Sequence, residues 1–180
     1  MATVFDVAAY VLRKQGRMTT MKLQKLVYYS QAWSLAWGSG PLFSEPTEAW
    51  EQGPVVRALW ETRRGFREID VADLPPHHSE ALTDAQQSDI DAVLGAYAGL
   101  SAERLSTTTH QETPWLAAIQ ADDPVISHDA MAAYFSALDP FDLSAHIEGA
   151  FLAKTLLARC RGEDPHGEWD WGPPVGQEVW

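Results

Sequence analysis

The chain has little of what stabilises exported proteins or anchors membrane proteins. Cys160 is the single cysteine in 180 residues, so neither an intramolecular disulfide nor a cysteine-ligated metal site can form. No apolar run approaches the roughly 18 residues that cross a bilayer, and the N-terminus lacks a basic stretch followed by a long apolar core. We therefore expect a soluble, cytoplasmic protein that makes no contact with a membrane.

Sequence signatures of catalysis are also lacking. There is no G-x-S-x-G, no G-x-x-x-x-G-K-[ST] and no G-x-G-x-x-G, the motifs of a nucleophile elbow, a P-loop and a dinucleotide site. His110 and Glu112 have the H-x-E spacing of zinc deaminases, but those enzymes also need two cysteines. His77 and His78 are adjacent, so they point apart in an extended segment and form a poor chelate. We expect no enzyme activity, no cofactor and no metal; the alternative is a hydrolase that uses His110 and a carboxylate such as Glu51.

Basic residues are scarce after residue 67. Residues 68–180 carry four Lys and Arg against twenty Asp and Glu, whereas residues 1–67 carry nine against five, and the whole chain has a formal net charge of −12. Such an acidic body repels phosphate backbones, so nucleic acid is disfavoured as a partner. The basic residues that could make an exception lie near the N-terminus: Arg13, Lys14, Arg17, Lys22 and Lys25. The same field would attract a basic protein.

Helical periodicity dominates what is present. A chain of 180 residues with 46% apolar residues suits one domain. Apolar residues at helical spacing predict a central helix over residues 21–37, ended by Gly38. Further helices are expected over residues 2–15, from Pro54, from the capping box of Thr83 and Gln86, and after Ser101, Thr113, Ser127 and Ser144. A short edge strand is expected within residues 43–50, and residues 63–80 are expected to form an exposed loop.

These patterns predict an all-α fold of about seven or eight helices with a minor β element near residues 42–52. We divide the chain into a helical domain, residues 1–160, and an acidic, Trp-rich tail, residues 161–180. Five tryptophans within the helical domain are expected to anchor the core, because large aromatic side chains dominate core burial. They are Trp33, Trp37, Trp50, Trp60 and Trp115. Glu45, Glu48 and Glu51 are expected to form a solvated acidic rim.

Two groups of residues are candidates for binding a partner. Gln24, Tyr28 and Gln31 lie four and three residues apart, so they share one polar and aromatic face of the central helix. That face either contacts a partner or forms an internal hydrogen-bonding strip that holds neighbouring elements. Trp169, Trp171 and Trp180 belong to the tail. They either pack back on the domain or anchor a partner, as Trp does at interface hot spots.

Three sequence blocks resemble one known family. They are KLQKLVYYSQAWSLAW, then PLFSEPTEAWEQGPVV, then HQETPWLAAI, which starts at His110. In this order the blocks resemble the Panacea domain of SocA-type antitoxins of bacteria and phages, over roughly residues 5–138. The resemblance implies an antitoxin that neutralises a toxin encoded beside it by direct protein contact. For SocA-type members it implies the alternative of a proteolytic adaptor, which delivers the toxin to a protease.

Overall fold

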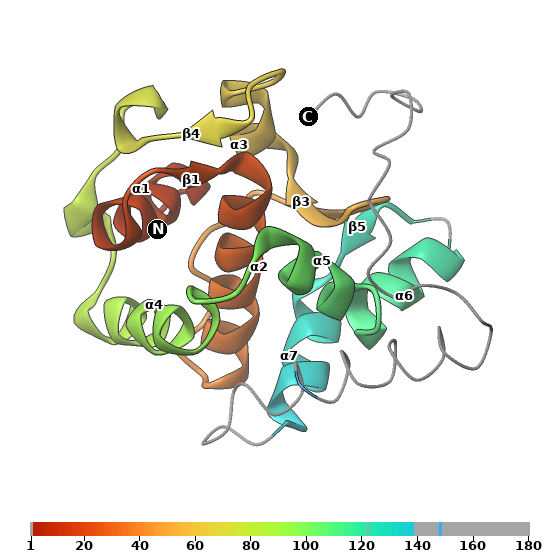
Figure 1. Ribbon diagram of the computed structural model, residues 1–180. Coiled ribbons are helices and arrows are strands. Elements are labelled where there is room, and N and C mark those ends of the chain that lie inside the picture. Colours follow the sequence, from red (N-terminus) through yellow and green to blue (C-terminus); the bar gives the residue numbers. More distant parts are fainter. Residues whose placement is uncertain (1, 122, 139–147, 149–180) are drawn as a thin grey trace.

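The structure is a computed structural model, and it describes residues 2–121, 123–138 and 148 of the chain (Figure 1). The described part is mostly helical. Its helices are α1 (Val4–Gln15), α2 (Thr20–Ala36), α3 (Arg57–Thr62), α4 (Asp84–Tyr97), α5 (Ala102–Thr109), α6 (Thr113–Ala121) and α7 (His128–Ser136). Two 3-10 turns, η1 (Val71–Asp73) and η2 (Ser79–Ala81), lie between α3 and α4. None of the described helices is both long and apolar enough to cross a bilayer.

Two small antiparallel sheets join the helices. The first pairs β1 (Met18–Thr19) with β4 (Glu68–Ile69), and the second has the order β3-β2-β5, with β2 (Thr47–Trp50) in the middle. β3 (Gly53–Val56) forms a hairpin with β2, and β5 (Val125–Ile126) pairs with the other edge of β2. The mostly helical prediction is therefore confirmed, but the fold is not purely α. The strand expected within residues 43–50 is present, but its prediction as an edge strand is wrong, because β2 begins after Pro46 and pairs on both sides.

The helix α2 is the centre of the molecule. Figure 1 shows α1 and α4 on one side of it and α5 and α7 on the other. Every residue from Leu23 to Ser34 is buried, so α2 is surrounded on all its faces and its polar side chains need partners within the protein.

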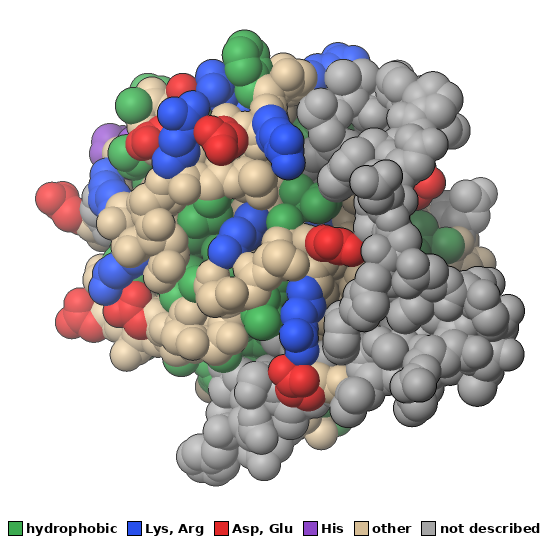
Figure 2. All heavy atoms as spheres, in the orientation of Figure 1, with side chains coloured by type: hydrophobic (Ala, Val, Ile, Leu, Met, Phe, Trp, Pro, Cys, Tyr) green, Lys and Arg blue, Asp and Glu red, His purple; other side chains and the backbone are tan. Residues whose placement is uncertain are grey.

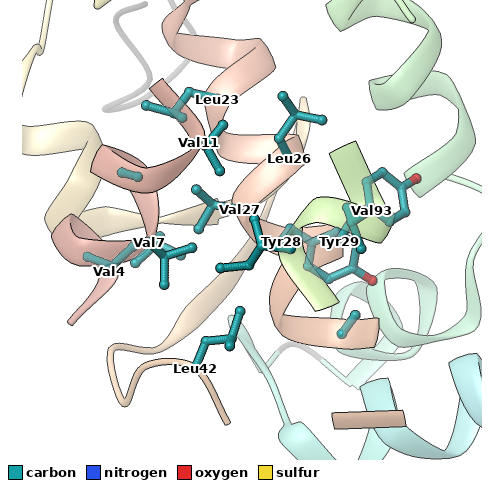
Figure 3. Close-up of a cluster of buried hydrophobic side chains, with 14 of the residues drawn as sticks. Val4, Val7, Val11, Leu23, Leu26, Val27, Tyr28, Tyr29, Leu42 and Val93 are labelled. Atoms are coloured by element: carbon teal, nitrogen blue, oxygen red, sulfur yellow. The ribbon is translucent and has the colours of Figure 1, made fainter. Parts of the chain in front are cut away.

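Apolar side chains of α1 and α2 form the first part of the core. Figure 3 shows Val7 and Val11 of α1 near Leu23 and Val27 of α2. All four side chains are at most 1% exposed. Val4, Val7 and Val11 are buried at spacings of three and four, and they place one face of α1 against α2, as the sequence predicts for residues 2–15.

Aromatic rings form the second part of the core, where α2 meets α4 and α7. The Tyr29 and Tyr97 rings stack with centroids 4.5 Å apart, and the Phe135 ring meets Trp33 edge to face at 5.2 Å. The Trp33 indole N–H donates to the Tyr97 hydroxyl over 2.8 Å. Of the other tryptophans expected in the core, Trp50 and Trp60 are buried, while Trp37 and Trp115 are half-buried.

Side-chain caps begin most of the helices where the sequence predicts them. Thr19, Ser101 and Ser127 each accept a hydrogen bond from a first-turn N–H, and Thr83 forms the expected capping box with Gln86. Each cap satisfies one of the N–H groups that a helix start leaves without an intrahelical partner. The expected helix after Ser144 lies outside the described residues.

Asp6 completes a further capping box, with Thr3, at the start of α1. Its carboxylate accepts from the backbone N–H of Thr3 and from the backbone N–H of His78. Burial by itself raises the pKa of Asp6, but the hydrogen bonds from His78 and Thr3 outweigh it and hold the pKa below its ordinary value. The charged carboxylate therefore fastens the segment around η2 to α1.

Two expectations for residues 54–80 are wrong. The helix predicted from Pro54 begins only at Arg57, because Gly53–Val56 is strand β3 and Pro54 pairs with Ala49 across the hairpin. Proline suits both assignments, since its fixed φ also fits an edge strand that needs no N–H donor there. Residues 63–80 are not all exposed loop either, because Ile69 of β4 is buried.

Candidate functional site

The polar face of α2 lies inside the protein. Gln24, Tyr28 and Gln31 are at most 2% exposed. The Gln24 amide binds the backbone of Val56 at both ends: its oxygen accepts from the Val56 N–H over 2.9 Å, and its nitrogen donates to the Val56 carbonyl over 3.3 Å. Gln24 thus acts as a strand partner for β3 and fastens the hairpin to α2.

Gln31 performs the same role for the segment before β2. Its amide oxygen accepts from the Leu42 N–H over 2.7 Å, and its nitrogen donates to the Phe43 carbonyl over 3.0 Å. These backbone partners fix which end of the amide donates. The same amide nitrogen lies 3.0 Å from His128 Nε2, so Gln31 also contacts the start of α7.

Tyr28 and its neighbour Tyr29 converge on one buried carboxylate. Their hydroxyls donate to the two oxygens of Glu112, over 3.2 Å from Tyr28 and 2.8 Å from Tyr29, and Glu112 is 1% exposed. Burial, followed by the nearby charge of Glu112, raises the pKa of both tyrosines well above its ordinary value. Both phenols therefore stay protonated and act as hydrogen-bond donors, which a buried carboxylate requires.

Lys25 lies in the same interior. Its side chain is fully buried, and its ammonium donates to the Pro54 carbonyl over 3.0 Å. The expectation that Lys25 could meet a phosphate backbone is therefore wrong. Helix α5 adds a run of buried hydroxyl residues, Ser106 to Thr109, and the Ser106 hydroxyl donates to the Gln52 carbonyl at the hairpin turn over 2.8 Å.

We call Gln24, Lys25, Tyr28, Tyr29, Gln31 and Glu112 the polar core. Its side chains connect the hairpin, the segment before β2, the start of α6 and α7 to α2. For Gln24 and Gln31, the structure agrees with the second interpretation of the sequence, an internal hydrogen-bonding strip. Direct contact of Gln24, Tyr28 and Gln31 with a partner stays a prediction, and their burial in the isolated chain argues against it.

The prediction from sequence did not include Lys25 or Glu112 in this network. Lys25 and Tyr29 lie four residues apart on α2, so they share a face. A lysine inside an otherwise uncharged stretch, LQKLVYYSQAW, was a usable signal. Glu112 follows Tyr28 by 84 positions, and no local pattern connects the two.

The three acidic residues near the hairpin do not form one solvated rim. Glu45 is half-buried and accepts from the Val4 N–H over 3.3 Å, whereas Glu51 is exposed at the hairpin turn. Glu48 receives two hydrogen bonds from Arg57, at 3.1 and 3.0 Å, and one from the Trp50 indole. Burial raises the pKa of Glu48, but the bonds from Arg57 and Trp50 hold it below its ordinary value.

The hydrolase alternative relies on His110 and Glu51, which belong to different elements of the fold. The His110 ring packs against the Trp115 indole with centroids 4.5 Å apart at the end of α5, while Glu51 is exposed at the turn between β2 and β3. Within residues 2–121, 123–138 and 148, no three His, Cys, Asp or Glu side chains are grouped as metal ligands. Trp169, Trp171, Trp180 and Cys160 lie outside the described residues.

Comparison with known protein families identifies the family of this chain. The family described as "Antitoxin SocA-like, Panacea domain" matches residues 23–116, just over half of the chain and most of the resemblance predicted from the three sequence blocks. No curated protein and no solved structure matches the chain. The matched residues run from the first buried leucine of α2 to the first turn of α6, and they contain all six residues of the polar core. The chain therefore belongs to the family of SocA-like antitoxins with a Panacea domain.

Proposed function

We propose that this protein neutralises a toxin encoded beside it by binding the toxin directly. Membership of the antitoxin family is the observation that carries the proposal. The fold supports it through rigidity: the polar core fastens elements distant in sequence to one central helix, and a preorganised body loses less conformational entropy when it binds. The acidic charge favours a basic toxin, because opposite charges speed association.

The toxin-binding surface is proposed to involve the tail. Trp169, Trp171 and Trp180 would act as apolar anchors among acidic residues, in a segment beyond the family match. Deleting residues 163–180 should leave a folded protein that neutralises its toxin poorly. Loss of cooperative unfolding after the deletion would instead assign these residues to the fold.

Co-expression tests the proposal as a whole. The toxin gene is induced in bacteria with and without this protein, and tagged protein is then captured from the rescued cells. Direct neutralisation predicts rescue together with a stable complex that contains the toxin. Rescue without a complex, lost in a strain that lacks its main cytoplasmic proteases, would identify a proteolytic adaptor.

A further inference from the structure

Four arginines and an exposed phenylalanine lie in two segments of this acidic protein that the pairing of β1 with β4 brings side by side. We call Arg17, Arg63, Arg64, Phe66 and Arg67 the arginine surface. Its residues come from the segment between α1 and β1 and from the turn between α3 and β4. Figure 2 shows Lys and Arg side chains, with a few acidic ones among them, over the end of the molecule where α1, α3 and β4 lie in Figure 1.

Local contacts hold these residues together. The Arg63 guanidinium lies 4.1 Å from the centre of the Phe66 ring, and its Nε donates to the Glu68 carbonyl over 3.3 Å. The Glu68 carboxylate faces Arg17 at 3.1 Å. Across the sheet, the Thr20 N–H donates to the Arg67 carbonyl over 3.0 Å, so the segment after α3 is fixed against the segment after α1.

The arginine surface keeps accessible charge and accessible apolar area. Phe66 is 56% exposed, the highest value among the large apolar side chains of the described residues. The ion pair of Arg17 with Glu68 is 59% and 52% exposed, and exposed pairs of this kind exchange partners at little cost. The Arg67 side chain is exposed and makes no ion pair with the part of the chain that the structure describes.

We propose that the arginine surface binds an acidic segment of another protein that carries an aromatic side chain. Arginine binds carboxylates through two parallel N–H donors and also stacks on aromatic rings. Clusters of arginine are a recurrent way to recognise acidic motifs. An aromatic side chain of the partner would cover Phe66, which otherwise stays in water.

A polypeptide fits this surface better than a nucleic acid does. Glu68 and Asp73 lie among the arginines, the latter 3.3 Å from Arg63, where they would face phosphates. The chain's net charge of −12 also opposes a polyanion as dense as DNA, which carries a charge about every 1.7 Å. The proposal does not depend on the toxin, because the toxin is expected to be basic whereas the ligand proposed for this surface is acidic.

The test uses the full chain and a fluorescein-labelled random copolymer of glutamate and tyrosine as the probe. Fluorescence anisotropy at low salt should show binding that weakens as salt is added. Arg67→Glu should reduce the affinity by about tenfold or more, because it replaces an arginine that would bind carboxylate with a like charge. Lys14→Glu changes the net charge equally, but its side chain pairs with Asp91 outside the arginine surface, so it should reduce the affinity by less than about threefold.

Two further measurements isolate the apolar contribution and the class of ligand. Phe66→Ser should weaken binding of the Glu/Tyr copolymer while leaving binding of polyglutamate unchanged, since polyglutamate offers no ring. The proposal is overturned if wild-type protein does not bind the copolymer, or if Arg67→Glu and Lys14→Glu weaken it equally. Tighter binding to duplex DNA than to the copolymer would also overturn it and would assign the surface to nucleic acid.

Discussion

The glycine at the hairpin turn, Gly53, offers the sharpest test of how tightly the polar core is packed. Its φ of +96° lies in the region that side chains rarely adopt. A Cβ atom built there would lie 2.5 Å from the Thr109 hydroxyl oxygen and 2.9 Å from the Lys25 ammonium nitrogen. Thr109 and Lys25 are fully buried, and each is held by a hydrogen bond to a backbone carbonyl. Neither side chain can retreat without breaking such a bond.

The expected destabilisation of Gly53→Ala has two parts. Forcing alanine into the left-handed region costs about 1–2 kcal/mol, and overpacking a well-filled interior costs about 1–3 kcal/mol more. The total is about 2–5 kcal/mol. Gly65→Ala is the matched control, because Gly65 has φ +82° but no atom within 4 Å of its Cβ position. The control should be destabilised only by the backbone strain, about 1–2 kcal/mol.

Urea denaturation of wild type, Gly53→Ala and Gly65→Ala measures the cost of backbone strain and the cost of overpacking. If Gly53→Ala is no less stable than Gly65→Ala, the packing argument is refuted. A double variant gives a second check, because Thr109→Ala removes the oxygen nearest the new methyl group. Adding Gly53→Ala to Thr109→Ala should then cost less than it does in wild type, with a coupling energy of about 0.5–3 kcal/mol.

Other substitutions test the interior at separate points. Tyr28→Ala should destabilise the protein by about 3–5 kcal/mol, because it removes a fully buried ring, whereas Tyr28→Phe should cost about 1 kcal/mol by losing the bond to Glu112; an unchanged melting temperature in Tyr28→Ala would contradict the burial. Asp6→Asn tests the lowered pKa of Asp6: the carboxylate stabilises the fold above its unfolded-state pKa and loses that contribution as pH falls through the folded-state pKa. The stability gap between wild type and Asp6→Asn, measured with urea over a pH series, should therefore be full at neutral pH and close in acid; a gap that does not change with pH would refute the assignment.

Local chemistry explains which parts of the fold could be predicted from the sequence. Thr83 and Ser127 begin helices through a hydroxyl that acts within one turn, so a short stretch of sequence contains the whole signal. The apolar spacing of α2 likewise places Leu23, Leu26 and Val27 in the core. In such places the residues that produce the signal lie close together in the chain.

The remaining features depend on contacts between distant segments. Periodicity identifies the polar face of α2, but it cannot show that β3 and the end of α5 cover that face. Two interpretations of Gln24 therefore stayed open, and Lys25 was expected to be accessible. Pro54 is compatible with a helix start and with an edge strand, and the bond from Lys25 to its carbonyl is formed only in the folded chain. Glu112 needs Tyr28 and Tyr29 as donors, and more than eighty residues separate them along the chain.

Titration of purified toxin with this purified protein, in the absence of any protease, tests the central claim most directly. Direct neutralisation predicts that toxin activity falls in proportion to the added protein and reaches zero at a fixed stoichiometric ratio, with a complex at the same ratio in size-exclusion chromatography. If the toxin keeps its full activity in an excess of folded protein, the proposal of neutralisation by binding is contradicted.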